Sequence, residues 1–186
     1  MIDTGEIKRG ITIEVDGKLY QVMDFQHLKL GRGSAQFRIK LRDLREGHTL
    51  ERSFQAGAKF ALARLERRPI QYLYREGDLH YFMDQETFEQ NPLPPSLLKE
   101  ALPYLKEGQA LEMLTYKNQP VGVELPAAVE LMVADTGPAF KGDTAQGGRK
   151  PARLETGLTI QVPLHITPRD KVKVDTRTGA YLEKAS

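Results

Sequence analysis

From Phe37 to Arg42 the chain alternates at every position between an apolar and a basic side chain. Successive side chains of a β-strand point to opposite faces, so a period of two predicts a strand with one buried face. The basic members are Arg38, Lys40 and Arg42, and neighbours in this row would lie roughly 7 Å apart. The pattern therefore predicts a half-buried strand that shows a row of cations to solvent.

Just before this strand, one arginine stands between two glycines in Gly31-Arg32-Gly33, with Lys29 close by. Glycine adopts positive φ without steric cost, which predicts the tip of a hairpin. Residues 29–45 hold six basic residues and one acidic residue, Asp43. Such a finger suits a polyanion such as nucleic acid. A solvated strand beside a glycine turn would show the same local pattern, but the lack of interspersed acids favours nucleic acid.

Short alternating segments separated by turn residues recur along almost the whole chain, which predicts an all-β protein. The clearest pairs are residues 11–15 with 18–22 around an Asp16-Gly17 turn, 70–74 with 79–83, and 110–116 with 120–125. Residues 129–133, 158–164 and 171–174 continue the pattern. One short helix is expected, with Ser96 as its N-cap and Pro103 at its end.

Three small barrels in series account for these strands. We expect an SH3-like barrel in residues 1–64, an OB-type barrel in residues 65–127 and a third barrel in residues 128–186. These segments hold 12 basic and 8 acidic residues, 6 and 10, and 9 and 7, for net charges of +4, −4 and +2. The division suggests two polyanion contacts separated by an acidic segment.

The composition excludes several classes of protein. The chain has no cysteine, so disulfides, thiolate catalysis and cysteine metal sites are ruled out. No apolar run approaches the ~20 residues that a membrane span needs, and the N-terminal residues are not those of a leader. We therefore expect a cytoplasmic protein without membrane contact, and a monomer.

Signals of an enzyme are weak. The four histidines, His27, His48, His80 and His165, are scattered and lack metal-ligand spacing. The pair Gly31-x-Gly33 lacks the third glycine of a dinucleotide-binding loop, and no phosphate-loop or nucleophile motif is present. The sequence predicts no catalytic residues, no metal and no cofactor.

Residues 135–152 are rich in glycine and proline, and they are expected to form a long loop. Loops of this length inside compact domains are usually functional or disordered. Gly142, Asp143 and Thr144 offer backbone N–H groups, an acid and a hydroxyl, and Arg149 and Lys150 add charge, a combination suited to RNA. An ordinary connector is the alternative.

These motifs together resemble the bacterial elongation factor P family, relatives of the hypusine-bearing eukaryotic and archaeal factor. The resemblance covers essentially the whole chain. It rests on residues 29–35, 71–74, 81–90, 142–144, 148–157, 162–164 and 173–179.

The resemblance implies an L-shaped, tRNA-like protein with a KOW-type first domain and two OB-fold domains. Such a protein enters the 70S ribosome between the peptidyl-tRNA and exit sites. It promotes peptide bond formation, notably at consecutive prolines. By position, Arg32 would approach the CCA end of the peptidyl-tRNA, flanked by Lys29, Gly31 and Gly33. Gly142, Asp143 and Thr144 would face the exit-site mRNA codon, with ribosomal RNA nearby.

The family's pattern also admits a large-subunit stalk protein and an arginine-rhamnosylating enzyme as partners. Members carry a modified lysine, a rhamnosylated arginine or an unmodified residue at the tip, so both states of Arg32 stay open. Leu30 replaces a frequent proline, and residues 168–170 replace a turn that often contains glycine. A divergent paralogue, or an SH3/OB adaptor acting away from the ribosome, is therefore the alternative.

Overall fold

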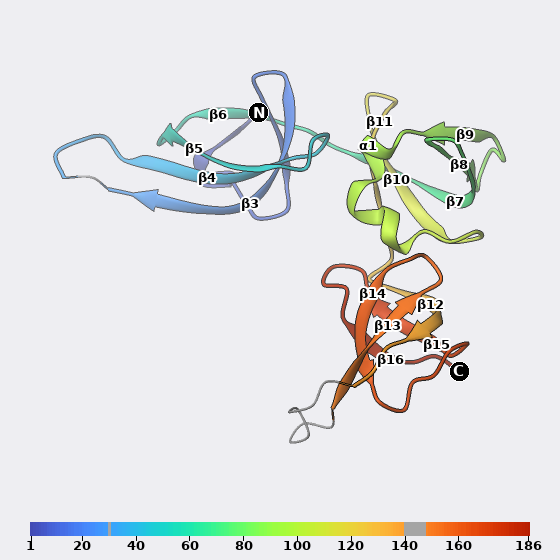
Figure 1. The fold of residues 1–186 in the computed structure, drawn as a ribbon. Coiled ribbons are helices and arrows are strands. Elements are labelled where there is room, and N and C mark those ends of the chain that lie inside the picture. The colour runs from blue at the N-terminus through green and yellow to red at the C-terminus, as the bar shows by residue number, and fades with distance from the viewer. Residues whose placement is uncertain (30, 140–147) are drawn as a thin grey trace. The chain divides into compact units, whose positions relative to one another are not determined.

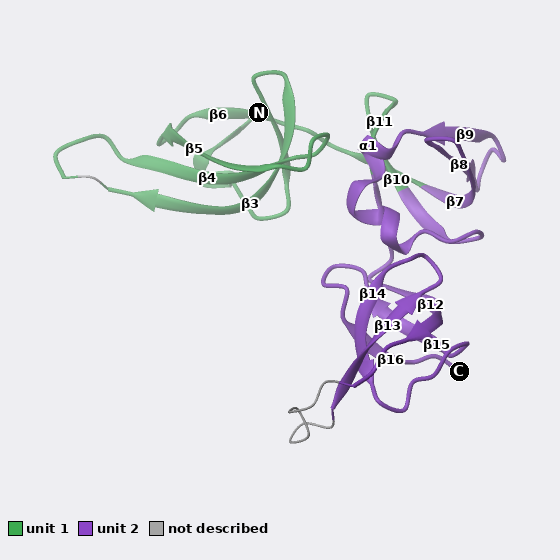
Figure 2. Cartoon of the chain, viewed as in Figure 1, with its two compact units in different colours: residues 1–68, 113–122 green, residues 69–112, 123–186 purple. Residues whose placement is uncertain are grey.

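The computed structural model describes residues 1–29, 31–139 and 148–186, and it consists mainly of strands (Figure 1). The strands form one six-stranded and two five-stranded sheets, so the predicted all-β class is confirmed. The chain divides into two compact units (Figure 2). Unit 1 comprises residues 1–68 and 113–122, and unit 2 comprises residues 69–112 and 123–186. The predicted bounds of the three domains stay predictions.

The first sheet has the strand order β1-β6-β2-β3-β4-β5. Its elements are β1 (Ile2–Asp3), the 3₁₀ helix η1 (Thr4–Glu6), β2 (Thr12–Val15), β3 (Lys18–Leu28), β4 (Gln36–Asp43), β5 (Thr49–Gln55) and β6 (Lys59–Leu62). Buried side chains from four of these strands form its core, among them Ile13, Val22, Phe37 and Ile39. The Asp-Gly hairpin is confirmed, because Asp16 and Gly17 both have positive φ, 50° and 75°, as a two-residue turn between twisted strands requires.

The second sheet has the order β11-β10-β7-β8-β9. It is built from β7 (Glu66–Glu76), β8 (Leu79–Asp84), β9 (Gln90–Leu93), β10 (Ala110–Tyr116) and β11 (Gln119–Glu124). Between β9 and β10 lie the helix α1 (Pro95–Leu98) and the 3₁₀ helix η2 (Lys99–Tyr104). Buried side chains of this region include Ile70, Tyr72 and Phe82.

The predicted helix is present, but its predicted ends are wrong. Pro94 occupies the N-cap, without a side-chain capping hydrogen bond, and Pro95 the first turn, so Ser96 lies inside α1. Proline suits this place because its missing N–H would have no partner there anyway. Pro103 lies within η2 rather than beyond it.

The third sheet has the order β14-β13-β12-β15-β16. Its strands are β12 (Ala128–Thr136), β13 (Arg149–Leu154), β14 (Thr159–Pro163), β15 (Lys171–Asp175) and β16 (Tyr181–Lys184). Fully buried aliphatic residues such as Leu131, Leu154 and Val172 fill its core. Among the described residues, no helix has the length and apolar character needed to cross a membrane.

The predicted loop at residues 135–152 is shorter than expected. Strand β12 continues through Thr136, β13 already begins at Arg149, and Asp135 pairs with Arg153. The N–H of Gly137 also donates to the Pro151 carbonyl at 2.8 Å, which continues the pairing by one step. Backbone pairing with β14 on the other side of β13 outweighs the low strand propensity of this glycine- and proline-rich stretch.

Candidate nucleic-acid interface

The predicted finger is the hairpin of β3 and β4, which is labelled in Figure 1. Phe37, Ile39 and Leu41 on β4 have no exposed surface, whereas Arg38 and Lys40 between them are exposed. Strand β4 pairs with β5 up to Gln36, and the N–H of Ala56 donates to the Ala35 carbonyl at 3.0 Å. The predicted alternation is therefore confirmed, and the described residues 29 and 31–35 lie between the ends of β3 and β4.

Aromatic side chains hold the two strands together below the tip. The rings of Phe25 and Phe37 stack with centroids 5.5 Å apart, and His27 meets Phe37 edge-on at 4.5 Å. Aromatic pairs across strands add stability beyond the area they bury. The hairpin that ends in the tip is therefore stabilised by aromatic packing between β3 and β4.

The tip places Arg32 in solvent. Gly31, Arg32 and Gly33 are all exposed, as is Lys29. Gly31 has a φ of 48°, a conformation that side-chain-bearing residues rarely adopt, and a Cβ there would meet no atom within 4 Å. The glycine therefore serves the backbone conformation of the turn.

The row of cations on β4 is less isolated than the sequence indicates. Lys40 pairs in register with Asp24 on one side and Glu51 on the other, whereas Arg38 lies between Gln26 and Ser53. Asp24 reaches this face because a bulge in β3 follows Val22 and reverses which residues point outward. The acids that are missing from β4 itself come from its neighbours, so the two exposed cations differ in electrostatic environment.

Asp24 also binds Arg9. The guanidinium of Arg9 donates to Asp24 Oδ1 at 2.8 Å, and the N–H of Phe25 donates to the same oxygen at 2.9 Å. These hydrogen bonds hold the pKa of Asp24 below its usual range, with Lys40 contributing through its charge. Asp24 is therefore ionised at neutral pH and partly neutralises Lys40. Arg42, the third predicted cation, is only half exposed.

The structure also brings together three side chains that no sequence pattern indicated. The side-chain atoms of Asp43, Glu46 and His48 that could bind a metal ion lie within 4.8 Å of one another, in the turn between β4 and β5. Burial raises the pKa of Asp43, but N–H donors from Glu46 and Arg45 outweigh it, and the pKa lies below its usual value. His48 Nδ1 lies 3.3 Å from Glu46 Oε2. The two N–H groups that donate to Asp43 form a turn in which an aspartate binds the backbone that follows it. This turn joins β4 to β5 and explains why the three side chains are close together.

The second predicted RNA-binding region belongs to unit 2 and to the third sheet. Gly142, Asp143 and Thr144 lie outside the described residues. Arg149 is exposed and Lys150 half-buried at the start of β13, where they pair with Pro163 and Val162. Gly148 has a φ of 47°, and a Cβ there would come within 3.0 Å of Leu164 Cδ1.

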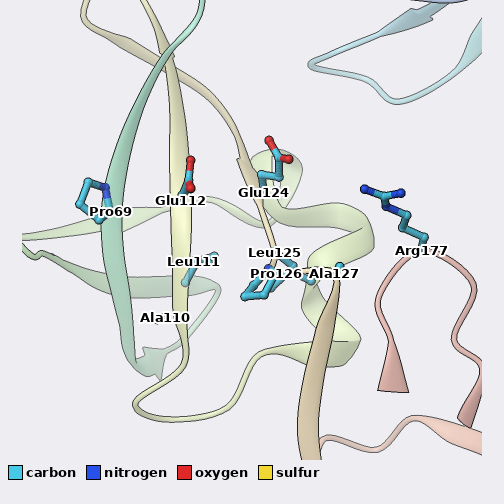
Figure 3. A pocket seen from close by; sticks show the side chains of 9 residues that line it. All are labelled: Pro69, Ala110, Leu111, Glu112, Glu124, Leu125, Pro126, Ala127 and Arg177. Atoms are coloured by element: carbon cyan, nitrogen blue, oxygen red, sulfur yellow. The ribbon is translucent and has the colours of Figure 1, made fainter. Parts of the chain in front are cut away.

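A pocket of about 450 Å³ in unit 2 is drawn in Figure 3. Leu111, Leu125 and Pro126 line it, with Glu112, Glu124 and Arg177 among its charged residues (Figure 3). None of the described residues predicted to act lines this pocket. The candidate interface is therefore the exposed finger and not a cavity.

Comparison with known proteins agrees with this arrangement. Models of three families match successive parts of the chain: the "Elongation factor P (EF-P) KOW-like domain" at residues 3–60, the "Elongation factor P (EF-P) OB domain" at residues 65–123, and "Elongation factor P, C-terminal" at residues 129–184. A solved structure of translation initiation factor 5A from Methanococcus jannaschii is similar in fold, with a TM-score of 0.53 and 24% identity. It covers 66% of this chain and 92% of its own.

Full-length relatives are much closer in sequence. Elongation factor P of Moorella thermoacetica is 52% identical over 185 residues, covering 100% of both chains. Elongation factor P of Pelotomaculum thermopropionicum is 48% identical over 184 residues, covering 99% of this chain and 100% of its own. The chain therefore belongs to the elongation factor P family of translation elongation factors.

Proposed function

We propose that this protein binds the 70S ribosome between the peptidyl-tRNA and exit sites and relieves stalling at consecutive prolines. The observation that carries the proposal is the placement of Arg32, exposed between two glycines at the tip of a packed hairpin. Family membership supports it, since the relatives are named as elongation factors. Arg32 is the group that approaches the CCA end of the peptidyl-tRNA.

The proposed action is positioning and not bond chemistry. Proline is a rigid, poor substrate, so holding the reacting ends in the productive geometry lowers the barrier. An arginine presents a planar set of five N–H donors and keeps its charge at any physiological pH, which suits contact with phosphate and ribose oxygens. The factor contributes binding energy at the tRNA end and supplies no acid, base or cofactor, so it is not itself an enzyme.

The other contacts follow from charge and position. Arg38 and, more weakly, Lys40 face ribosomal RNA or the acceptor end along β4, with Arg42 at the base of the row. Arg149 and Lys150 flank the segment with Gly142, Asp143 and Thr144, which we assign to the exit-site codon. We assign the work to a cytoplasmic monomer of three domains, residues 1–64, 65–127 and 128–186, a division supported by the three matched segments.

The decisive experiment is synthesis of a Pro-Pro-Pro peptide on purified ribosomes with Arg32→Ala. We expect the rate to fall at least about tenfold, which corresponds to about 1.4 kcal/mol of lost positioning energy. The free energy of unfolding should stay within about 0.5 kcal/mol of wild type, because the Arg32 side chain is exposed. Ser34→Ala, two residues away and also exposed, is the matched control and should keep the wild-type rate. An Arg32→Ala protein with the wild-type rate would remove Arg32 from the proposal.

Arg32→Lys separates charge from shape. Lysine keeps the charge but lacks the planar guanidinium and any arginine-specific modification. If charge alone matters, this variant keeps most of the rate. If the guanidinium contacts or rhamnose matter, it falls to the level of Arg32→Ala, and intact-mass measurement of the native protein then separates these two causes.

A further inference from the structure

The sheet of unit 2 carries an aromatic pair on its outer surface. Tyr74 and Tyr81 stack with ring centroids 4.8 Å apart and planes at 16°. Tyr74 is 46% exposed and lies opposite Tyr81 in register. The next pair on the same face is Glu76 with Leu79, and Leu79 is 39% exposed.

A bulge produces this pair. Tyr72 pairs with Phe82 and both are buried, so regular alternation would send Tyr74 inward as well. The register shifts between Tyr72 and Tyr74, which turns Tyr74 to the opposite face, where it meets Tyr81. A bulge that re-aims one side chain is a recurrent feature of functional surfaces.

The pair belongs to a larger surface, which we name the tyrosine face. It comprises the residues that share the outer side of β7, β8 and β9 by register: Gln71, Tyr74, Glu76, Leu79, Tyr81, Met83, Gln90 and Pro92. These three strands lie next to one another in the sheet (Figure 1). In an OB fold, the face of the second and third strands, here β8 and β9, is a common ligand surface.

The charge around the tyrosine face points to a basic partner. Residues 66–93, which span β7 to β9, contain three basic residues, Arg67, Arg68 and Arg75, and six acids, Glu66, Glu76, Asp78, Asp84, Glu86 and Glu89. Five of the acids are exposed, and only Asp84 is buried. The guanidinium of Arg75 already donates to the Gly77 carbonyl at 2.8 Å. Nucleic acid would be repelled here, whereas arginine or lysine side chains would gain both charge contacts and the faces of two tyrosine rings.

We propose that the tyrosine face is a docking surface for a basic protein segment. The segment lies across the face and not along the edge of the sheet. Pro92 sits in the edge strand β9 and has no N–H to donate, which disfavours addition of another strand there. Exposed tyrosines supply large contact area at low entropic cost, and they are enriched at protein interfaces.

The test uses the full chain with a single fluorescent reporter. The protein has no tryptophan, so Tyr81→Trp places one tryptophan in the face while keeping an aromatic ring there. Leu182→Trp, at a position 50% exposed on β16 of the third sheet, is the matched control. The probes are a peptide of alternating arginine and leucine, the same peptide with glutamate for arginine, and an oligouridine of equal length.

We expect the arginine peptide to shift the emission of the Tyr81→Trp protein but not that of the Leu182→Trp protein. Adding Tyr74→Ala should raise the Kd at least about fivefold, because the second ring of the contact is lost. Raising the salt from about 0.05 M to about 0.3 M should also raise the Kd, since exposed charges are screened. Circular dichroism should show each variant folded.

The other outcomes overturn the proposal. A response to oligouridine instead of the arginine peptide makes the face an RNA platform, and an equal response to the glutamate peptide removes the charge argument. A signal that depends on protein concentration, with dimers in sedimentation, makes the occupant a second copy. If no probe changes the emission, Tyr74 and Tyr81 only pack against each other across the strands and do not form a docking surface. Adding Arg32→Ala to the Tyr81→Trp protein should leave its affinity for the arginine peptide unchanged. A failure of the docking surface is therefore distinguishable from a failure of the proposed function.

Discussion

The finger of unit 1 and the tyrosine face of unit 2 are antiparallel hairpins with opposite character. Between residues 29 and 45 the finger has six basic residues and one acid, whereas residues 66–93, from β7 to β9, have three basic residues and six acids. In the finger the stacked phenylalanines lie on the buried side and the cations face solvent. In the second hairpin an aromatic pair faces solvent. The chain thus presents one surface suited to polyanions and one suited to a basic protein.

A bulge in one strand decides the outer face in both hairpins. In β3 it follows Val22 and brings Asp24 beside Lys40, and in β7 it follows Tyr72 and brings Tyr74 beside Tyr81. One extra residue reverses the parity of every later side chain on that strand. The lesson is that the chemistry of an exposed sheet face depends on register as much as on residue type.

The largest expected effect is on the free energy of unfolding, and it compares one aromatic ring from each hairpin, Phe37 and Tyr81. Phe37→Ala should destabilise the protein by about 3–5 kcal/mol, because it empties a fully buried site. Tyr81→Ala should cost no more than about 1 kcal/mol, the range of an exposed cross-strand pair. Urea denaturation followed by circular dichroism measures both. Equal losses would mean that the tyrosine pair is structural, and the contrast between the hairpins would break down.

A smaller effect separates the two exposed cations of the finger. Arg38→Ala should reduce the slope of log affinity against log salt for ribosome binding by about 0.7–0.9, the loss of one phosphate contact. Lys40→Ala should reduce it by less, because Asp24 and Glu51 already flank Lys40. The slope of the double variant Lys40→Ala with Glu51→Gln, compared with that of Lys40→Ala, shows how much of the difference depends on Glu51. Identical slopes for the two single variants would show that the flanking acids do not matter.

The smallest effect is on pH dependence, and it lies beneath the tyrosine face. Burial lowers the pKa of His80, with the charge of Arg75 contributing, and His80 Nδ1 lies 3.1 Å from the Tyr72 hydroxyl. The unfolded chain therefore binds a proton at higher pH than the folded chain. The free energy of unfolding should fall as pH drops below about 6.5, the unperturbed histidine pKa, toward the folded value.

Denaturation at a series of pH values between about 7 and 5 checks this expectation. His80→Asn should flatten the dependence, and His165→Asn, at an exposed histidine, is the matched control. Arg32-dependent peptide synthesis should not follow the same curve, because His80 belongs to unit 2 and the tip to unit 1. A steeper fall in stability with His80→Asn would contradict the assignment.

Local pattern was enough to predict much of the fold and the finger. Alternation along residues 37–42 predicted a buried apolar row and an exposed basic one, because strand side chains have a period of two. The Asp16-Gly17 turn and the exposed tip at Arg32 followed from the positive φ that glycine permits. These features depend on neighbours within a few residues, so the amino-acid sequence by itself determined them.

Contacts between distant segments decided the rest. Pairing with β14 placed Arg149 and Lys150 in a strand, although local composition assigned them to a loop. The acids beside Lys40 come from other strands, and the bulges that place Asp24 and Tyr74 on outer faces leave no sequence signal at those positions. Register is set where two strands meet and one face is buried, and only the tertiary structure holds both strands at once.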